Sequence, residues 1–269
     1  MLISRISQLT VPCSDDGARF VTTNRLDLIR RALLESQHEC VADLPLAKIF
    51  RHRHFQKADA TILVSCHIDS CYRKYFAASK DGEMHGTFDN SACNAIAVEA
   101  MLNNRLPAQA LVSFTGDEEN QSRGVDQTIA FLQEVKLFDS LEMVVILHIT
   151  EEYFQSRHFT VENYFFRERH AQSLLHFDGK RDLKRYLRTM LESPAFVEDA
   201  APDEAWQYGK YDLNCVSLCL PCRVLDSDMH ADTGVTITEA SIDGFSIAFG
   251  QCARRLIQDL AVKMLQRSG

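Results

Sequence analysis

Apolar runs of strand length alternate with helical patterns along most of this chain. Four short apolar runs, each bounded by polar residues, predict buried strands at residues 61–66, 110–115, 143–149 and 215–220. Between and after these runs, apolar residues recur at helical spacing and predict helices at residues 24–34, 91–101, 124–135 and 239–266. Strands that alternate with helices predict a largely parallel sheet covered on both faces.

The segment from residue 159 to residue 199 has a less regular pattern. Residues 159–165 can form a strand, and the charged stretch at residues 179–188 has the spacing of an amphipathic helix. An exposed helical face accounts for its lysines and arginines better than a basic binding patch does.

Residues that can bind a metal ion stand at the ends of the predicted strands. The first run is followed by His67 and Asp69, the second by Glu118 and Glu119, and the third contains His148 near its end. Ligands bind at the carboxyl ends of the strands in such sheets, so these side chains are expected to converge at one edge.

Two further residues extend this pattern. Asp89 precedes a predicted helix whose N-terminus Asn90 and Ser91 can cap, which leaves the Asp89 carboxylate free to bridge two metal ions. His230 lies beside Asp228 in a loop that follows the fourth apolar run.

The spacing within these groups indicates what each could do. His67 and Asp69 are two residues apart on an extended segment, so both side chains point to one side, and the carboxylate can hold a metal-binding imidazole in place. Two adjacent carboxylates at the end of a buried strand repel each other unless a cation lies nearby. One glutamate of the pair can then bind the ion while the other acts as a general base toward water.

The overall composition is that of a globular protein and excludes several classes. The chain has 269 residues, of which 46% are hydrophobic, and its formal net charge of -8 argues against a nucleic-acid-binding protein. No apolar run is long enough to predict a membrane-spanning helix. The first residues lack the apolar core of a signal peptide, so a cytoplasmic location is expected.

Nine cysteines are present, and two of them form a Cys-x-x-Cys pair, Cys219 and Cys222. A redox motif is one interpretation of this pair. A buried structural role is favoured because Pro221 lies inside the pair and apolar residues precede it.

In their order along the chain, these motifs resemble the five motif blocks of the co-catalytic, or dinuclear, zinc exopeptidases. This superfamily includes aminopeptidases, carboxypeptidases and deacylases. The resemblance runs from residue 61 to residue 239 and implies a three-layer α/β/α sandwich with a mixed, mostly parallel central sheet. Only residues 70–88 separate Asp69 from Asp89, so no lid or dimerisation domain fits there, and one catalytic domain spanning residues 1–269 is expected.

The resemblance also implies two zinc ions and a set of ligands for them. Asp89 would bridge the two ions, with His67 and His148 completing the first site. Glu119 and His230 would complete the second site.

His148 departs from the family pattern, because relatives usually carry a carboxylate at this position. Imidazole is also a good zinc ligand, but it lacks the negative charge. We therefore expect the first site to bind metal more weakly, or to prefer zinc over harder ions such as manganese. A shifted alignment would instead make Glu151 or Glu152 the ligand.

The function implied is that of a metal-dependent hydrolase of amide bonds, aminopeptidase-like and acting on peptides. Glu118 would be the catalytic base, and Asp69 would orient the first histidine. The alternatives are an N-acyl amino acid deacylase and a non-catalytic metal-binding protein whose site has drifted. Tyr208, Tyr211 and Arg223 are candidate substrate contacts.

Overall fold

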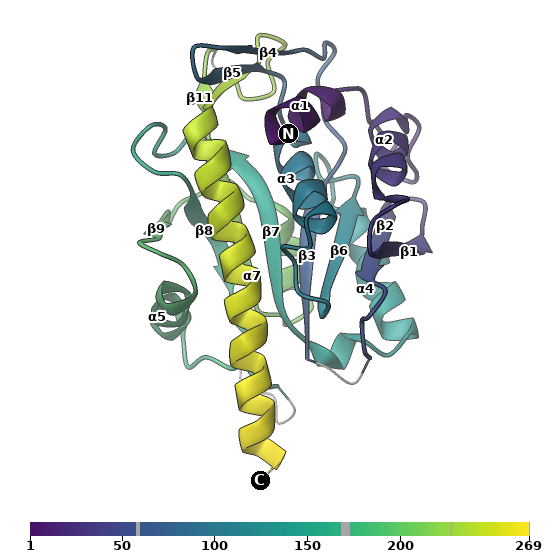
Figure 1. Cartoon of the computed structure of the whole chain (residues 1–269), viewed down its shortest axis with the longest axis vertical. Coiled ribbons are helices and arrows are strands. Elements are labelled where there is room, and N and C mark those ends of the chain that lie inside the picture. The colour runs from purple at the N-terminus through teal and green to yellow at the C-terminus, as the bar shows by residue number, and fades with distance from the viewer. Residues whose placement is uncertain (58–59, 168–172, 227, 269) are drawn as a thin grey trace.

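A mixed eight-stranded sheet forms the centre of the protein in the computed structural model, which describes residues 1–57, 60–167, 173–226 and 228–268 (Figure 1). The strand order is β1-β2-β6-β3-β7-β10-β8-β9. The central strands run parallel to one another: β6 (Ala110–Thr115), β3 (Thr61–His67), β7 (Leu141–Thr150) and β10 (Cys215–Pro221).

Two further strands flank this parallel centre on each side. On one side, β2 (Ala47–His52) is antiparallel to β6, and β1 (His38–Asp43) is antiparallel to β2. On the other side, β8 (Thr160–Phe165) is antiparallel to β10 and parallel to the two-residue β9 (Ala195–Phe196). The sheet is therefore mixed but mostly parallel at its core.

Helices cover both faces of the sheet, as the alternating sequence pattern predicts. One face carries α1 (Leu2–Leu9), α2 (Asn24–Leu33), α3 (Ser91–Leu102), α5 (Lys180–Met190) and the long α7 (Glu239–Ser268) (Figure 1). The other face carries α4 (Arg123–Glu134) and α6 (Glu204–Gly209), with the short 3-10 helix η1 (Phe138–Ser140) beside α4.

The two hydrophobic clusters show how the strands divide their side chains between these layers. On β3, Ile62 and Val64 pack in the cluster that includes α1, α2, α3, α5 and α7, whereas Leu63 packs in the cluster with α4 and α6. Successive side chains of a strand point to opposite faces, so each central strand contributes to both clusters. The three-layer α/β/α architecture is confirmed.

A second, smaller antiparallel sheet lies at the top of the molecule in Figure 1. Its strand order is β11 (Arg223–Val224), β12 (Val235–Thr238), β5 (Glu83–Gly86) and β4 (Ala77–Lys80). The β5–β12 pairing joins the segment before residue 89 to the segment after residue 230. This sheet was not predicted, because its strands are short and the residues of β4 are largely exposed.

The main elements predicted from the sequence are confirmed. The strands expected at residues 61–66, 110–115, 143–149, 159–165 and 215–220 correspond to β3, β6, β7, β8 and β10. The charged helix is α5, which buries Leu183, Leu187 and Met190 on one side. Among the described residues, no helix combines the length and the apolar character needed to span a bilayer.

Candidate metal centre

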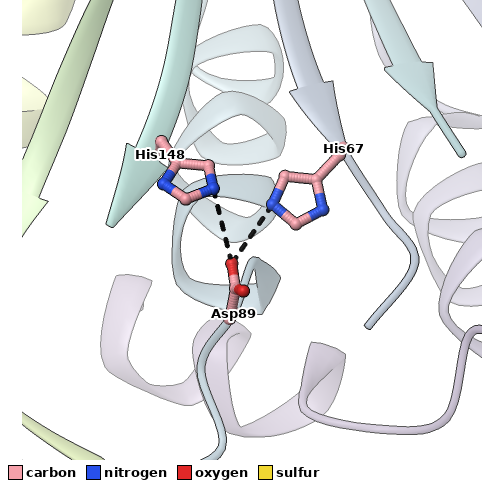
Figure 2. Close-up of side chains that lie close together, drawn as sticks. All are labelled: His67, Asp89 and His148. Atoms are coloured by element: carbon pink, nitrogen blue, oxygen red, sulfur yellow. Dashed lines mark hydrogen bonds and ion pairs between the residues drawn. The ribbon is translucent and has the colours of Figure 1, made fainter. Parts of the chain in front are cut away.

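Two histidines lie side by side near the carboxyl ends of neighbouring strands. Ser65 of β3 is paired with Ile146 of β7, so His67 and His148, each two residues further on, lie side by side on the same face. Their rings are stacked, with centroids 5.0 Å apart and an interplanar angle of 28°. Figure 2 shows both imidazoles directed toward Asp89.

Asp89 lies just before α3 and presents its two carboxylate oxygens to different partners. Its Oδ1 is 3.1 Å from Nε2 of His67 and 3.8 Å from Nε2 of His148 (Figure 2). Its Oδ2 is 3.0 Å from Nε2 of His230. A carboxylate arranged in this way can bridge two cations.

Two groups of potential ligands therefore share Asp89. The ligand atoms of His67, Asp89 and His148 all lie within 4.8 Å of one another, and those of Asp89, Glu119 and His230 do the same. In the second group, Nε2 of His230 is 3.6 Å from Oε2 of Glu119. The five residues predicted as metal ligands are thus brought together.

Glu118 stands beside both groups. Its carboxylate belongs to a third cluster, with His67 and Glu119, whose ligand atoms also lie within 4.8 Å of one another. Burial raises the pKa of Glu118 to about 7, although the charges of His67 and His148 act in the opposite direction. A carboxyl group with this pKa can both accept and donate a proton near neutral pH.

The buried charges of the centre compensate one another. Burial alone would lower the pKa of His67, but the negative charges of Asp89 and Glu118 outweigh it and raise that pKa well above its usual value. Burial would raise the pKa of Asp89, yet His67 and His230 hold it well below the usual range. Hydrogen bonding to Asp89 raises the pKa of His230 to about 9, against the effect of burial. Protons on these imidazoles occupy positions for which a divalent cation would compete.

The residues present fit a divalent metal ion. Oε1 of Glu119 is buried and has no hydrogen-bond partner in the described part of the chain. Nδ1 of His148 lies 2.7 Å from the Ile149 carbonyl oxygen; since a carbonyl only accepts, Nδ1 carries a hydrogen, and in the neutral ring Nε2 carries the lone pair that a metal ion needs. Imidazoles combined with carboxylates form a donor set suited to zinc.

Asp69 lies close to a residue of each ligand group, His67 and Glu119. Its Oδ1 is 3.6 Å from Nδ1 of His67, beyond hydrogen-bond range, and neither atom has another partner among the described residues. Its Oδ2 accepts a hydrogen bond from the backbone N–H of Glu119 at 3.4 Å. Asp69 therefore lies beside His67 and is hydrogen-bonded to the loop that carries Glu119.

The first turns of α3 hold the strand ends, a role that the sequence did not reveal. The side-chain amide of Asn94 donates to the His67 carbonyl at 2.8 Å, and the Cys93 thiol donates to the His148 carbonyl at 3.1 Å. Asn90 was expected to cap α3, but its side chain makes no capping hydrogen bond and donates instead to the Leu147 carbonyl at 2.8 Å. The available signal was two asparagines, Asn90 at the N-cap and Asn94 in the first turn, beside a largely apolar and almost fully buried helix.

Asp117, which directly precedes Glu118 and Glu119, has a structural role. The carboxylate of Asp117 accepts hydrogen bonds from the backbone N–H of Arg123, at 3.2 Å, and from Nε of the same residue, at 2.7 Å. These contacts tie the loop with Glu118 and Glu119 to the start of α4.

The alternative ligands Glu151 and Glu152 lie beyond the end of β7 and are exposed. Neither belongs to a group of potential metal ligands among the described residues. His148 is the residue of this segment that approaches Asp89.

The three side chains considered as candidate substrate contacts are bonded to other groups of the protein. Tyr208 is fully buried, and its hydroxyl donates to Oγ of Ser65 at 2.9 Å. The Tyr211 hydroxyl donates to Asp126 at 2.7 Å, and Arg223 pairs with Glu83 at 3.3 Å. This part of the sequence interpretation is not supported.

The Cys-x-x-Cys pair is buried. Cys219 lies in β10 and Cys222 follows the strand, and burial raises the pKa of both thiols. A protonated, inaccessible thiol is a poor nucleophile, so the structural interpretation is favoured over the redox motif.

Two cavities flank the centre, and carboxylates dominate the polar lining of both. One cavity, of about 360 Å³, lies beside His148, and its acidic lining residues are Glu151, Glu152, Glu162, Asp199 and Asp203. The other, of about 240 Å³, lies beside Glu119, and its further acidic lining residues are Asp15, Asp16, Asp69 and Asp117. Neither cavity is lined by a lysine or arginine within the ranges that the structure describes. A larger cavity, of about 550 Å³, lies against α7 and is lined by none of the five predicted ligands.

Comparison with known proteins identifies the fold. No protein-family model and no curated protein sequence matches the chain. An aminopeptidase from the archaeon Desulfurococcus kamchatkensis is similar in structure, with a TM-score of 0.67, 10% sequence identity and 93% of each chain covered. The aminopeptidase PepT from Bacillus cereus has a TM-score of 0.64 and 11% identity, with 97% of this chain and 98% of that chain covered. The Bacillus subtilis YXEP protein, described as a dinuclear metal-binding peptidase of the M20 family, has a TM-score of 0.61 and 12% identity, with 96% and 97% covered. The chain has the fold of these peptidases.

Proposed function

We propose that this protein is a metal-dependent peptidase of the dinuclear zinc exopeptidase superfamily, most similar in action to an aminopeptidase. The observation that carries the proposal is the pair of ligand groups that share Asp89, with Glu118 beside them. The fold similarity to aminopeptidases supports the same conclusion.

We assign the metal ligands from this geometry. His67, Asp89 and His148 would hold one zinc ion, and Asp89, Glu119 and His230 a second. When bound, the ions would supply Lewis acidity that polarises the scissile carbonyl and lowers the pKa of water.

Glu118 would move the proton in the reaction. With a pKa of about 7, its carboxylate can accept a proton from the attacking water and then donate it to the nitrogen of the leaving amine. Glu118 is half-buried, which limits its contact with bulk water. Asp69 would keep the His67 ring oriented while the charge of the site changes.

The acidic cavities favour an aminopeptidase over an N-acyl amino acid deacylase. A peptide substrate of an aminopeptidase carries a free ammonium group, which carboxylates attract. The N-acyl amino acid that a deacylase binds carries a carboxylate, for which a lysine or arginine is the usual partner. The carboxylates that line both cavities suit the ammonium group.

A non-catalytic metal-binding protein is the remaining alternative. A protein that only holds a metal has no use for a half-buried carboxyl group beside the ligands whose pKa is about 7. The position of Glu118 therefore favours an enzyme.

We also infer that residues 1–269 act as one catalytic domain. The proposed ligands span residues 67 to 230, and one hydrophobic cluster contains both Ile6 and Leu260. Both ends of the chain therefore contribute to the core that supports the site.

Elemental analysis combined with a substrate panel tests the proposed function. Two zinc ions per chain are expected, with chromophore release from aminoacyl anilides and much slower release from their N-acetylated counterparts. Absence of both bound metal and turnover would overturn the proposal. Faster turnover of the N-acylated substrates would favour the deacylase.

A further inference from the structure

A fully buried arginine contacts the backbone next to the proposed metal centre. Arg25, in the first turn of α2, has 0% of its surface exposed. Its Nη1 donates a hydrogen bond to the carbonyl oxygen of Ile68 at 2.8 Å. Ile68 is the residue between His67 and Asp69, so Arg25 holds the backbone that carries both of these side chains.

The other two nitrogen atoms of the Arg25 guanidinium donate no hydrogen bond to the described residues. Its Nε and Nη2 are buried and have no hydrogen-bond partner among the described residues. A buried cation without a paired anion is unfavourable, and one hydrogen bond to a neutral carbonyl offsets only part of that cost. A leucine or methionine would fill the same space without the penalty, so packing alone does not account for an arginine here.

The charge of Arg25 reaches the surroundings of Asp69. Burial raises the pKa of the nearby Cys13 thiol to about 12; on this thiol Arg25 acts to lower the pKa and Asp69 acts to raise it. The guanidinium and the carboxylate therefore both lie close to Cys13. Asp15 also acts to raise the pKa of this thiol, so the Arg25 guanidinium and the carboxylates of Asp15 and Asp69 all lie in its neighbourhood.

We propose that Arg25 is a positioning residue for the metal centre. By holding the Ile68 carbonyl, it fixes the His67–Asp69 segment, and its charge offsets the carboxylates around that segment. This inference rests on the proposed function, because it assigns to Arg25 an effect on metal binding. Removing a group that orients a metal ligand weakens metal affinity roughly 10- to 100-fold.

Titration calorimetry with zinc chloride on the metal-free full chain tests this role. Arg25→Met is expected to weaken zinc binding at least about tenfold. If that variant does not fold, Arg25→Gln, which keeps a polar side chain without the charge, is expected to show the same loss. A folded Arg25 variant that binds zinc as tightly as the wild type would overturn the proposal.

Arg167 provides a matched control. It is also buried, at 5% exposure, and its Nε donates to the Asp212 carbonyl at 2.7 Å, near the amino end of β10 and so at the opposite edge of the sheet. Arg167→Met is expected to unfold at a lower urea concentration while its zinc affinity stays unchanged. An equal loss of zinc affinity in both variants would show that general destabilisation is responsible and would also overturn the proposal. Failure of the wild type to bind zinc would instead refute the metal centre itself.

Discussion

The Nε2 atoms of His67 and His148 face the same carboxylate oxygen of Asp89, at 3.1 Å and 3.8 Å. The arrangement follows from the parallel pairing of β3 with β7, which sets the two imidazoles abreast at one edge of the sheet. The resemblance to the dinuclear zinc exopeptidases predicts a carboxylate at the end of β7, and an imidazole lies there instead, within 3.8 Å of Asp89.

Replacing Glu118 by glutamine is expected to lower kcat by about 10²- to 10⁴-fold, because the amide cannot accept the proton from water. Zinc content is expected to stay at the wild-type level, since Glu118 is not one of the proposed ligands. Steady-state kinetics and elemental analysis on the same preparation measure both quantities. Glu134→Gln, which changes an exposed carboxylate at the end of α4, is the control. Unchanged turnover in Glu118→Gln would exclude it as the base.

Replacing His148 by aspartate is expected to shift metal preference toward manganese. The substitution adds a negative charge and exchanges a nitrogen donor for an oxygen donor, which harder ions prefer. The ratio of manganese affinity to zinc affinity should rise on the order of tenfold in titration calorimetry. His176→Asp, at an exposed histidine, should leave the ratio unchanged. The same ratio in wild type and His148→Asp would contradict a ligand role for His148.

His38 is expected to make the fold less stable in mild acid. Burial, together with the neighbouring His52, lowers its pKa from 6.5 to about 4. As the pH falls below 6.5, the unfolded chain gains a proton that the folded chain does not, so stability is lost down to about pH 4 and then levels off. The loss should be about 2 kcal/mol, allowing for partial screening.

Urea unfolding at pH 7 and pH 5 measures this effect. His38→Leu should lose less stability between the two pH values than the wild type does, whereas His54→Gln, at an exposed histidine, should lose as much. An identical loss in His38→Leu and wild type would rule out His38 as the source.

Gly124→Ala is expected to lower the free energy of unfolding by about 2 kcal/mol. A Cβ at this position would lie 2.6 Å from the carbonyl oxygens of Gly116 and Leu46, so backbone would have to move. The displaced segment leads into Glu118 and Glu119, and zinc affinity should fall as well. Gly179→Ala, where a Cβ meets nothing within 4 Å, is the control for chemical denaturation. Equal midpoints for both variants would contradict the close packing.

The sequence predicted the layers of the fold because long apolar runs and helical periodicity depend on local pattern. The central strands β3, β6 and β10 are buried along their whole length and β7 at every residue except His148, and such runs are easily recognised. The strands β4, β5, β11 and β12 were missed, because two to four residues carry too little pattern to distinguish a strand from a loop.

The convergence of the candidate metal ligands could be predicted for a similar reason. His67 and His148 stand at recognisable strand ends, and strand ends of a parallel sheet meet at one edge. The groups that support them could not be predicted. Arg25 reaches Ile68 across 43 positions of sequence, and its own surroundings indicate only a helix. Tyr208 illustrates the opposite error, since an aromatic residue near the motifs proved to be part of the core.

The pairing of β5 with β12 would give the proposed metal ions a route of release that leaves the main sheet intact. Asp89 and His230 belong to segments joined by this short ladder, in which Val235 pairs with Gly86 and Thr238 with Glu83. If the ladder frays, the two ligands separate while β3 and β7 remain paired. By thermodynamic reciprocity, an ion bound between the ligands would suppress that fraying by the same free energy. Zinc would then slow amide hydrogen exchange in the small sheet far more than in the central one.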